Sequence, residues 1–303
     1  MKVLVCDSIS ARGVERMREA CIDVDVQDTI TPEGLLQVIP GYDAMVVRSR
    51  TKVRKPVLDA AKQLKVIVRG GVGVDNIEVD YAQAKGVKVL NTPAASTDSV
   101  AELTIAYIFA LSRPIVQATE SLRAGKWEKA KFHGTEVQGK TLGIIGMGRI
   151  GMAVGKRAAA LGMIVLGYDS RTVGAAPFMM MVGIDELLAR ADYITVHIPL
   201  TEESQHMIGA DTIAMMKKGV RLIDCARGGV IDEEALYDAL VSGHVAGAAL
   251  DVFENEPLTD HRLFSLPQVI GSPHMGASTA EATERIGDEV ADLLVTVNRE
   301  GCS

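Results

Sequence analysis

The stretch Thr141-Leu142-Gly143-Ile144-Ile145-Gly146-Met147-Gly148-Arg149-Ile150-Gly151 places a glycine-rich turn directly after a run of apolar residues. Its last six residues read G-x-G-x-x-G, at the point where a strand should turn into a helix. Gly146 permits a tight turn, Gly148 lets the backbone approach a pyrophosphate, and Gly151 allows the helix to press against the strand. The dipole of the predicted helix favours negative charge at its N-terminus, where the glycines lie. The stretch predicts a dinucleotide site; a purely structural glycine turn is the alternative.

An acidic residue strengthens the dinucleotide interpretation. Asp169 follows a second apolar run, residues 163–168, and lies 18 positions beyond Gly151. Its carboxylate could accept hydrogen bonds from the adenosine ribose hydroxyls and would repel a 2′-phosphate. Arg171 could in principle meet such a phosphate, but beside Asp169 this alternative is minor. The predicted cofactor is therefore NAD rather than NADP.

Composition narrows the function class. The chain has 303 residues, enough for two domains or one large one, and a net charge of −7, which argues against a nucleic-acid partner. No stretch approaches the roughly 18 to 20 apolar residues of a membrane span, so no membrane partner is expected. The first residues read as a strand rather than a signal peptide. Four scattered cysteines without a C-x-x-C pair favour a reduced, cytoplasmic setting. No histidine or carboxylate spacing predicts a metal.

Short β-branched runs alternate with helical patterns along most of the chain, which implies parallel sheets covered on both faces. The predicted strands are 2–6, 22–26, 44–48, 66–69, 87–90, 141–145, 163–168, 193–197, 221–224, 247–251 and 269–271. The predicted helices include 31–39, 56–61, 149–161, 184–189, 232–242 and about 278–298.

The position of the nucleotide motif in mid-chain predicts the domain organisation. We expect an α/β fold with two doubly wound parallel-sheet domains. Residues 1–93 and 277–303 would form a discontinuous, flavodoxin-like substrate-binding domain, and residues 94–276 an inserted NAD-binding Rossmann domain. Ser99 and Glu102 have capping-box spacing before an apolar helix. The segment 122–139 shows no regular pattern and suggests an arm that reaches a partner subunit.

Polar residues follow three of the later strands, at the edge where open parallel sheets place ligands. Arg227 could hold a carboxylate and polarise a carbonyl, and His274 could shuttle a hydroxyl proton near neutral pH. Glu256 could touch the other ring nitrogen and fix its tautomer. A surface salt bridge, a solvated histidine and a loop carboxylate remain the alternatives. His197 would line the cofactor cleft rather than react.

The first part of the chain has polar loops of its own. Arg48, Ser49 and Arg50 follow one predicted strand, and Arg69 with the glycine-rich segment 70–73 follows the next. Glycine-rich turns expose backbone N–H groups that suit anions, and the arginines would suit a phosphate or carboxylate. A tight turn with solvated charges is the alternative.

In combination these segments resemble the D-2-hydroxyacid dehydrogenase family, from about residue 2 to the C-terminus, and most closely its members that act on 3-phosphoglycerate. The residues that carry the resemblance are 74–76 (VDN), 142–151 (LGIIGMGRIG), 225–229 (CARGG), 250–253 (LDVF), 256–257 (EP) and 273–279 (PHMGAST).

The resemblance implies roles for individual residues. Arg227 would bind the substrate carboxylate and its 2-oxygen, His274 would be the general acid/base, and Glu256 would orient it. Asp251 would meet the nicotinamide carboxamide. The other implied cofactor residues are Gly146, Gly148, Arg149, Ile150, Gly151, Asp169, Pro199, Thr201, Cys225, Ala226 and Gly276. The implied substrate residues are Arg48, Ser49, Arg50, Arg69, Gly71, Val72 and Gly73.

The activity implied by the resemblance is oxidation of 3-phospho-D-glycerate to 3-phosphohydroxypyruvate with NAD, the first step of L-serine biosynthesis. The same chemistry on glyoxylate, hydroxypyruvate or D-lactate remains open, as does an NAD(H)-sensing corepressor. The family also implies a homodimer or homotetramer. Residues 94–98 lack the asparagine that phosphoglycerate enzymes often carry there. Many relatives continue into C-terminal regulatory domains, so we expect this chain to be either a short form or a truncated one, and we predict no serine feedback for it.

Overall fold

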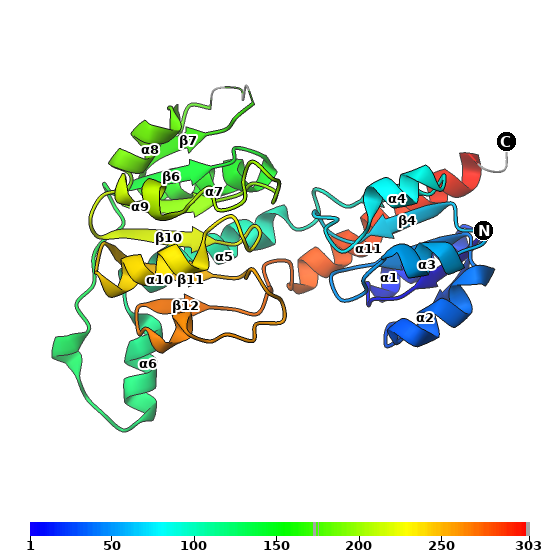
Figure 1. Ribbon diagram of the computed structural model, residues 1–303, viewed down its shortest axis with the longest axis horizontal. Helices are drawn as coiled ribbons and strands as arrows, with labels where there is room; N and C mark the ends of the chain where they lie inside the picture. Colours follow the sequence, from blue (N-terminus) through cyan, green and yellow to red (C-terminus); the bar gives the residue numbers. More distant parts are fainter. Residues whose placement is uncertain (172–173, 175, 301–303) are drawn as a thin grey trace. The chain divides into compact units, whose positions relative to one another are not determined.

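The computed structural model describes residues 1–171, 174 and 176–300. The chain splits into two compact units. Unit 1 comprises Met1–Thr97 and the segment from Ala277 onward, and unit 2 comprises Asp98–Gly276. Each unit is a parallel sheet with helices packed on it (Figure 1).

Unit 1 contains a five-stranded parallel sheet in the order β2-β1-β3-β4-β5. This order is that of flavodoxin-like folds, in which the chain reverses its direction of travel once across the sheet. The strands are β1 (Lys2–Val5), β2 (Asp23–Val26), β3 (Ala44–Val47), β4 (Val66–Arg69) and β5 (Lys88–Asn91).

Alternating side chains of these strands fill two separate cores. Val3 and Val5 of β1 point to the face covered by α1 (Ala11–Glu19) and α11 (Ala280–Glu300). Leu4 lies in the core of the opposite face. That face is covered by α2 (Pro32–Val38), α3 (Lys55–Ala60) and α4 (Val79–Ala84). Because both faces are covered, the three central strands, β1, β3 and β4, are apolar almost throughout.

Unit 2 contains a seven-stranded parallel sheet in the order β12-β11-β10-β9-β6-β7-β8. The chain runs outward from β6 to β8 and then returns to place β9 on the other side of β6. The carboxyl ends of β6 and β9 therefore form the switch point where doubly wound sheets bind ligands. The strands are β6 (Thr141–Ile145), β7 (Ile164–Tyr168), β8 (Met180–Met181), β9 (Tyr193–Val196), β10 (Val220–Asp224), β11 (Val245–Leu250) and β12 (Val269–Gly271).

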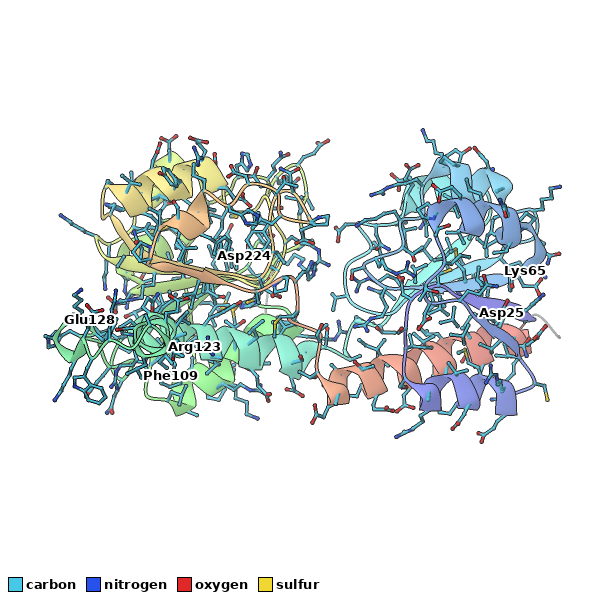
Figure 2. The ribbon with its side chains drawn as sticks, turned by 90° about the horizontal axis from the view of Figure 1, so that it is seen from below. Asp25, Lys65, Phe109, Arg123, Glu128 and Asp224 are labelled. Atoms are coloured by element: carbon cyan, nitrogen blue, oxygen red, sulfur yellow. The ribbon has the colours of Figure 1, made fainter. Side chains whose placement is uncertain are left out.

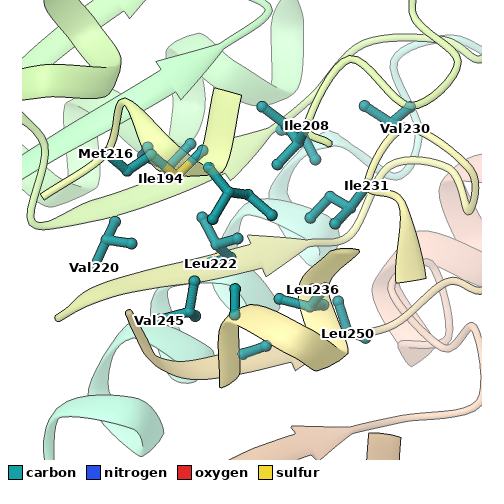
Figure 3. Close-up of a cluster of buried hydrophobic side chains, with 14 of the residues drawn as sticks. Ile194, Ile208, Met216, Val220, Leu222, Val230, Ile231, Leu236, Val245 and Leu250 are labelled. Carbon is teal, nitrogen blue, oxygen red and sulfur yellow. The ribbon is translucent and has the colours of Figure 1, made fainter. Parts of the chain in front are cut away.

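Two cores also flank the sheet of unit 2. On one face Ile194, Leu222 and Leu250 pack with residues of α8 (Ile184–Arg190), α9 (Ala210–Ala214) and α10 (Glu233–Val241), part of which is drawn in Figure 3. The other face packs on α5 (Thr97–Ser112) and α7 (Arg149–Ala160). The chain continues from α5 into α6 (Ile115–Arg123) before β6 begins.

The predicted fold class is confirmed, and each predicted strand is present with ends that differ by at most two residues. The capping box is wrong: α5 already begins at Thr97, so Ser99 lies inside the helix and its hydroxyl donates to the carbonyl of Gly276 at 2.6 Å. The segment 122–139 is not irregular throughout as expected. Its first two residues belong to α6, and Lys129–Lys131 form a 3₁₀ turn, η2. The strand β8 is absent from the prediction because two residues are too few to show a periodic pattern.

Within the described residues, no single helix is long and apolar enough to cross a membrane. The bent pair Thr97–Ser112 and Ile115–Arg123, with 67° between the two helices, meets the length and composition criteria together.

Candidate functional site

The glycine-rich turn joins β6 to α7 at the switch point of unit 2. Gly146 has φ of 95°, and a Cβ there would lie 2.6 Å from the carbonyl oxygen of His197, at the end of β9. A Cβ on Gly151 would lie 2.1 Å from the carbonyl oxygen of Gly146. Both positions therefore require glycine, one for the turn and one for the close packing of helix on strand.

The start of α7 is open. Gly148 is its N-cap residue and provides no side-chain cap, so the first N–H groups of the helix, from Arg149 and Ile150 onward, lack that partner. A Cβ on Gly148 would have no heavy atom within 4 Å, which leaves space above the turn. This cradle fits a pyrophosphate because it combines N–H donors, a helix dipole and room for close approach.

Asp169 lies beside this turn, one residue beyond β7. Its Oδ2 accepts the N–H of Met147 at 2.9 Å, and its Oδ1 accepts the N–H of Arg171 at 2.9 Å. Burial pushes the pKa of Asp169 up, but the N–H groups of Arg171 and Met147 outweigh it and hold the pKa below the usual range. The ionised carboxylate thus braces the turn and retains lone pairs for ribose hydroxyls.

The remaining predicted cofactor residues lie on loops at the carboxyl ends of β9 and β10. Pro199 and Thr201 are exposed on the loop after β9. Cys225 and Ala226 follow β10 directly, and burial raises the pKa of the Cys225 thiol, which excludes a thiolate near neutral pH. His197 is half-buried with its Nδ1 shielded from solvent, and burial of the ring lowers its pKa to about 3, so its imidazole is neutral at any physiological pH.

His274 and Glu256 form a direct pair. Nδ1 of His274 lies 2.7 Å from Oε2 of Glu256, and both side chains are about one-third exposed. Oε1 of Glu256 accepts the N–H of Phe253 at 3.2 Å, which holds the carboxylate in place. The pair commits Nδ1 to Glu256 and leaves Nε2 as the ring nitrogen suited to exchange a proton with a substrate.

Arg227 lies on the turn after β10, next to the loop that carries Glu256. Its Nη1 donates to the carbonyl of Ala226 at 2.5 Å. A Cβ on Gly228 would lie 1.9 Å from the carbonyl oxygen of Phe253, so glycine is needed for the two loops to pack backbone against backbone. The close approach sets Arg227 and Glu256 on adjoining segments of unit 2.

Asp251 anchors the loop that carries His274. It is 1 % exposed, and its Oδ1 accepts the N–H of Met275 at 2.8 Å while its Oδ2 accepts the N–H of Gly276 at 2.7 Å. The hydroxyl of Ser272 also donates to Oδ1 and is itself 2.5 Å from the hydroxyl of Tyr107 on α5. His274 sits in this anchored loop with φ of 51°, an uncommon conformation for a residue other than glycine.

A comparable loop in unit 1 carries Arg48 and Arg50. Asp7, which follows β1 and is buried, accepts the N–H of Arg48 at 2.5 Å and both the N–H and the hydroxyl of Thr51, at 3.2 and 2.7 Å. The amide of Asn76 donates to the carbonyls of Arg48 and Thr51, each at 2.7 Å. The backbone of this loop is therefore fixed from two sides.

The arginines predicted to bind substrate differ in their surroundings. The guanidinium of Arg50 donates to the carbonyls of Cys6, Asp28 and Ile30 and lies 2.9 Å from Oδ1 of Asp7. Burial lowers the pKa of Arg48, whose Nη1 donates a long bond of 3.4 Å to the backbone carbonyl of Ser8.

Arg69 lies against the glycine-rich segment that follows β4. A Cβ on Gly71 would lie 1.5 Å from Nη1 of Arg69, so the guanidinium packs directly on that backbone. Ser49, Val72 and Gly73 complete the predicted substrate residues, all on the loops after β3 and β4 of unit 1.

The predicted residues thus form two groups. All predicted catalytic and cofactor residues lie in unit 2, and all predicted substrate residues lie in unit 1. Sequence reasoning missed Asp7 and Asp224, and it gave Asp251 no anchoring role. The available signal was an acidic residue at the end of an apolar strand, which Asp169 had already illustrated. Among the described residues no cluster of histidine, cysteine or carboxylate groups could hold a metal ion.

Comparison with known proteins gives consistent results. The profile of the D-isomer specific 2-hydroxyacid dehydrogenase, NAD binding domain, matches residues 105–276. The D-3-phosphoglycerate dehydrogenase of Methanocaldococcus jannaschii is 48 % identical over 99 % of this chain and 58 % of its own length. The chain therefore spans a little more than half of that relative.

Two other proteins match over most of both chains. The hydroxypyruvate reductase of Thermotoga maritima is 50 % identical over 86 % of this chain and 87 % of its own length. The crystal structure of D-lactate dehydrogenase from Aquifex aeolicus, complexed with NAD and lactic acid, superposes with a TM-score of 0.85 at 30 % identity. That match covers 99 % of this chain and 96 % of the other.

Proposed function

Because the chain belongs to the D-isomer specific 2-hydroxyacid dehydrogenase family, we propose that it oxidises 3-phospho-D-glycerate to 3-phosphohydroxypyruvate, the first step of L-serine biosynthesis. Residues 105–276 are the NAD-binding domain of that family. Bound NAD supplies the hydride acceptor for C2 of the substrate. The glycine-rich turn, the start of α7 and Asp169 would hold the cofactor.

The proton chemistry belongs to His274 and Arg227. Nε2 of His274 takes the proton of the 2-hydroxyl group as the C2–H bond breaks, which leaves a carbonyl at C2. Glu256, 2.7 Å from Nδ1, stabilises the imidazolium that forms. Arg227 holds the substrate carboxylate and donates to the oxygen that becomes the carbonyl. In the reverse direction the same imidazolium returns the proton.

The observation that carries the substrate assignment is the 48 % identity to a D-3-phosphoglycerate dehydrogenase across 99 % of this chain. Arg48 and Arg69 supply cations at the carboxyl ends of neighbouring strands, β3 and β4. Guanidinium groups suit a phosphate dianion because they offer parallel N–H donors. Arg48 is the guanidinium that we assign to the phosphate.

Reduction of hydroxypyruvate is the second candidate. It is favoured by the 50 % identity to a hydroxypyruvate reductase over 86 % of this chain. It is also favoured by Arg50, whose guanidinium is engaged by three carbonyls and Asp7. A phosphate would have to compete with those bonds, whereas a substrate without phosphate would not.

The test is the absorbance of NADH at 340 nm with purified protein, NAD and 3-phosphoglycerate at alkaline pH, with the keto product trapped. His274→Ala is assayed in parallel. NADH formation that disappears in the variant supports the proposed reaction. Activity confined to hydroxypyruvate or glyoxylate with NADH would move the substrate but keep the family chemistry. NAD binding without turnover on any acid would contradict an enzyme and favour an NAD(H) sensor.

We also propose that the protein assembles as a dimer or tetramer through α6 and the segment that follows it. Trp127 is 82 % exposed, and Leu122 and Ile115 are more than half exposed on the same segment, the region of Arg123 and Glu128 in Figure 2. Exposed apolar side chains gathered in this way are typical of a protein interface, and a second copy is the occupant we expect. Light scattering should give a multiple of the chain mass, and Leu122→Asp with Trp127→Asp should give a monomer. A monomeric wild type would contradict the proposal.

A further inference from the structure

Asp224 ends β10, three residues before Arg227, and is 2 % exposed. Its Oδ1 accepts the N–H of Ala226 at 2.8 Å, and the N–H of Arg227 also bonds to its carboxyl group. A side-chain oxygen that accepts the N–H two residues ahead closes an Asx turn. The backbone conformation from which Arg227 projects is therefore set by the side chain of Asp224, which Figure 2 shows within unit 2.

The neighbours of Asp224 come from every side. Directly after β11 the N–H of Asp251 donates to the carbonyl of Asp224 at 2.8 Å, which brings a second buried carboxyl group close. On the β9 side Asp224 is in register with Val196, followed by His197. Glu233 of α10 lines the same cavity of about 10 Å³ as Asp224. Arg227 supplies a positive charge that acts on Asp224.

These surroundings keep the carboxyl group neutral over a wide range of pH. Burial raises the pKa of Asp224 to about 8, against the backbone N–H groups of Ala226 and Arg227 and the charge of Arg227. The nearby Asp251 adds to the rise. His197 is neutral and offers no compensating cation, and burial also raises the pKa of Glu233, a carboxyl group that carries no positive charge in either form. Asp224 is therefore neutral below about pH 8 and ionised above it.

We propose that Asp224 is a positioning residue for Arg227: its carboxyl group holds the turn that carries the arginine, and its ionisation draws the guanidinium away from the substrate carboxylate. This inference rests on the proposed function, in which Arg227 binds that carboxylate. The neutral form of Asp224 accepts the backbone N–H bonds and carries no charge that attracts the guanidinium of Arg227. The ionised form competes with the substrate for the same cation in a poorly solvated place, where the competition is strong.

Asp224→Asn tests the ionisation. Asparagine keeps the acceptor oxygen and the shape of the side chain but cannot ionise. The measurement is binding of oxamate, a 2-oxo acid mimic, to the protein–NADH complex at pH 7 and 9.5, followed by NADH fluorescence. The Kd of wild type should rise with pH by about 3- to 10-fold more than that of the variant, the factor expected for up to one unit of coupling. Both proteins keep His274, so its own ionisation cancels in the comparison.

Asp224→Leu tests the turn itself. Leucine removes the acceptor, so the KM of the acid should rise and amide exchange at Ala226 should accelerate, while Asp224→Asn restores both at pH 7. Asp192→Asn is the matched control. Asp192 accepts the N–H of Thr141 at 2.8 Å and pairs with Lys217, but it lies at the amino end of the same sheet. It should leave the pH dependence of oxamate binding as in wild type.

Equal pH dependence of oxamate binding in wild type and Asp224→Asn would overturn the inference while leaving the dehydrogenase assignment intact. Equal losses in the leucine and asparagine variants at pH 7 would overturn the role in the turn. If wild type neither binds oxamate nor turns over any 2-hydroxy acid, the proposed function fails and the inference fails with it.

Discussion

Two loops of the molecule are built in the same way and differ in what they present. The loop after β3 in unit 1 is held by Asp7, which accepts the N–H groups of Arg48 and Thr51. The loop after β12 in unit 2 is held by Asp251, which accepts the N–H groups of Met275 and Gly276. The first loop carries Arg48 and Arg50, and the second loop carries His274. In both loops a buried aspartate fixes the backbone, and the side chains that the loop carries determine its chemistry.

Asp7 and Asp251 each hold their loop in one backbone conformation. Each buried N–H left without an acceptor would cost roughly 1–3 kcal/mol, so a carboxylate that satisfies two of them opposes every alternative loop conformation. The loops differ in the strain they carry, because His274 has a positive φ. Such a conformation persists only where its surroundings hold it. In the proposed function, unit 2 carries the residues assigned to the reaction and unit 1 carries the arginine assigned to the phosphate.

The largest effect should come from the side chains that carry the proton. His274→Ala should lower kcat by about 10²- to 10⁴-fold, the usual contribution of a general acid/base. Glu256→Gln should lower kcat less, because the ring keeps a hydrogen-bond partner but loses the charge that stabilises the imidazolium. Steady-state rates on the best acid measure both. A Glu256→Gln variant with unchanged kcat across the pH range would remove Glu256 from the mechanism.

Removal of the two anchors should separate the loops by kinetic signature. Asp251→Ala frees the N–H groups beside His274 and should lower kcat by roughly tenfold or more, given about 1–3 kcal/mol for each unsatisfied N–H. Asp7→Ala should raise the KM of a phosphorylated substrate and leave kcat close to that of wild type. Thermal unfolding of both variants controls for general loss of structure. The same kinetic signature in both would break the comparison.

A smaller effect is expected at Asp169, which braces the glycine-rich turn and faces the ribose in our proposal. Asp169→Ser should weaken NAD binding and shift the preference toward NADP by about tenfold, or about 1.4 kcal/mol, because a charge that repels a 2′-phosphate is removed. The kcat/KM values for the two cofactors measure this preference. An unchanged ratio would mean that Asp169 acts only on the N–H groups of Met147 and Arg171.

The fold was largely predictable from the sequence, and the reason is physical. Strands buried on both faces must be apolar throughout, so runs such as Thr141–Ile145 stand out between helical patterns. The glycine-rich turn is equally easy to predict from the sequence, because Gly146 and Gly151 have no room for a side chain. The pairing of His274 with Glu256 was predicted from residue types, aided by the family resemblance, and their side chains lie 2.7 Å apart.

The features that escaped prediction depend on partners distant in the sequence. Asp7 acts on residues more than forty positions away, and Asp251 acts 24 and 25 positions away. Nothing local to Ser99 indicates that its hydroxyl bonds to Gly276, so its spacing was mistaken for a cap. The bonds of Arg50 to three carbonyls were likewise hidden, because each acceptor is a backbone atom on another segment.

The central claim is that the loop after β3 binds the phosphate and the loop after β12 carries the histidine that transfers the proton. Arg48→Ala tests this claim most directly. The measurement is kcat/KM of wild type and variant on 3-phosphoglycerate and on D-glycerate, which lacks only the phosphate. We predict a loss of at least about tenfold on 3-phosphoglycerate, equivalent to about 1.4 kcal/mol, and almost none on D-glycerate. Equal losses on both acids would contradict the claim, because Arg48 would then act on something other than the phosphate.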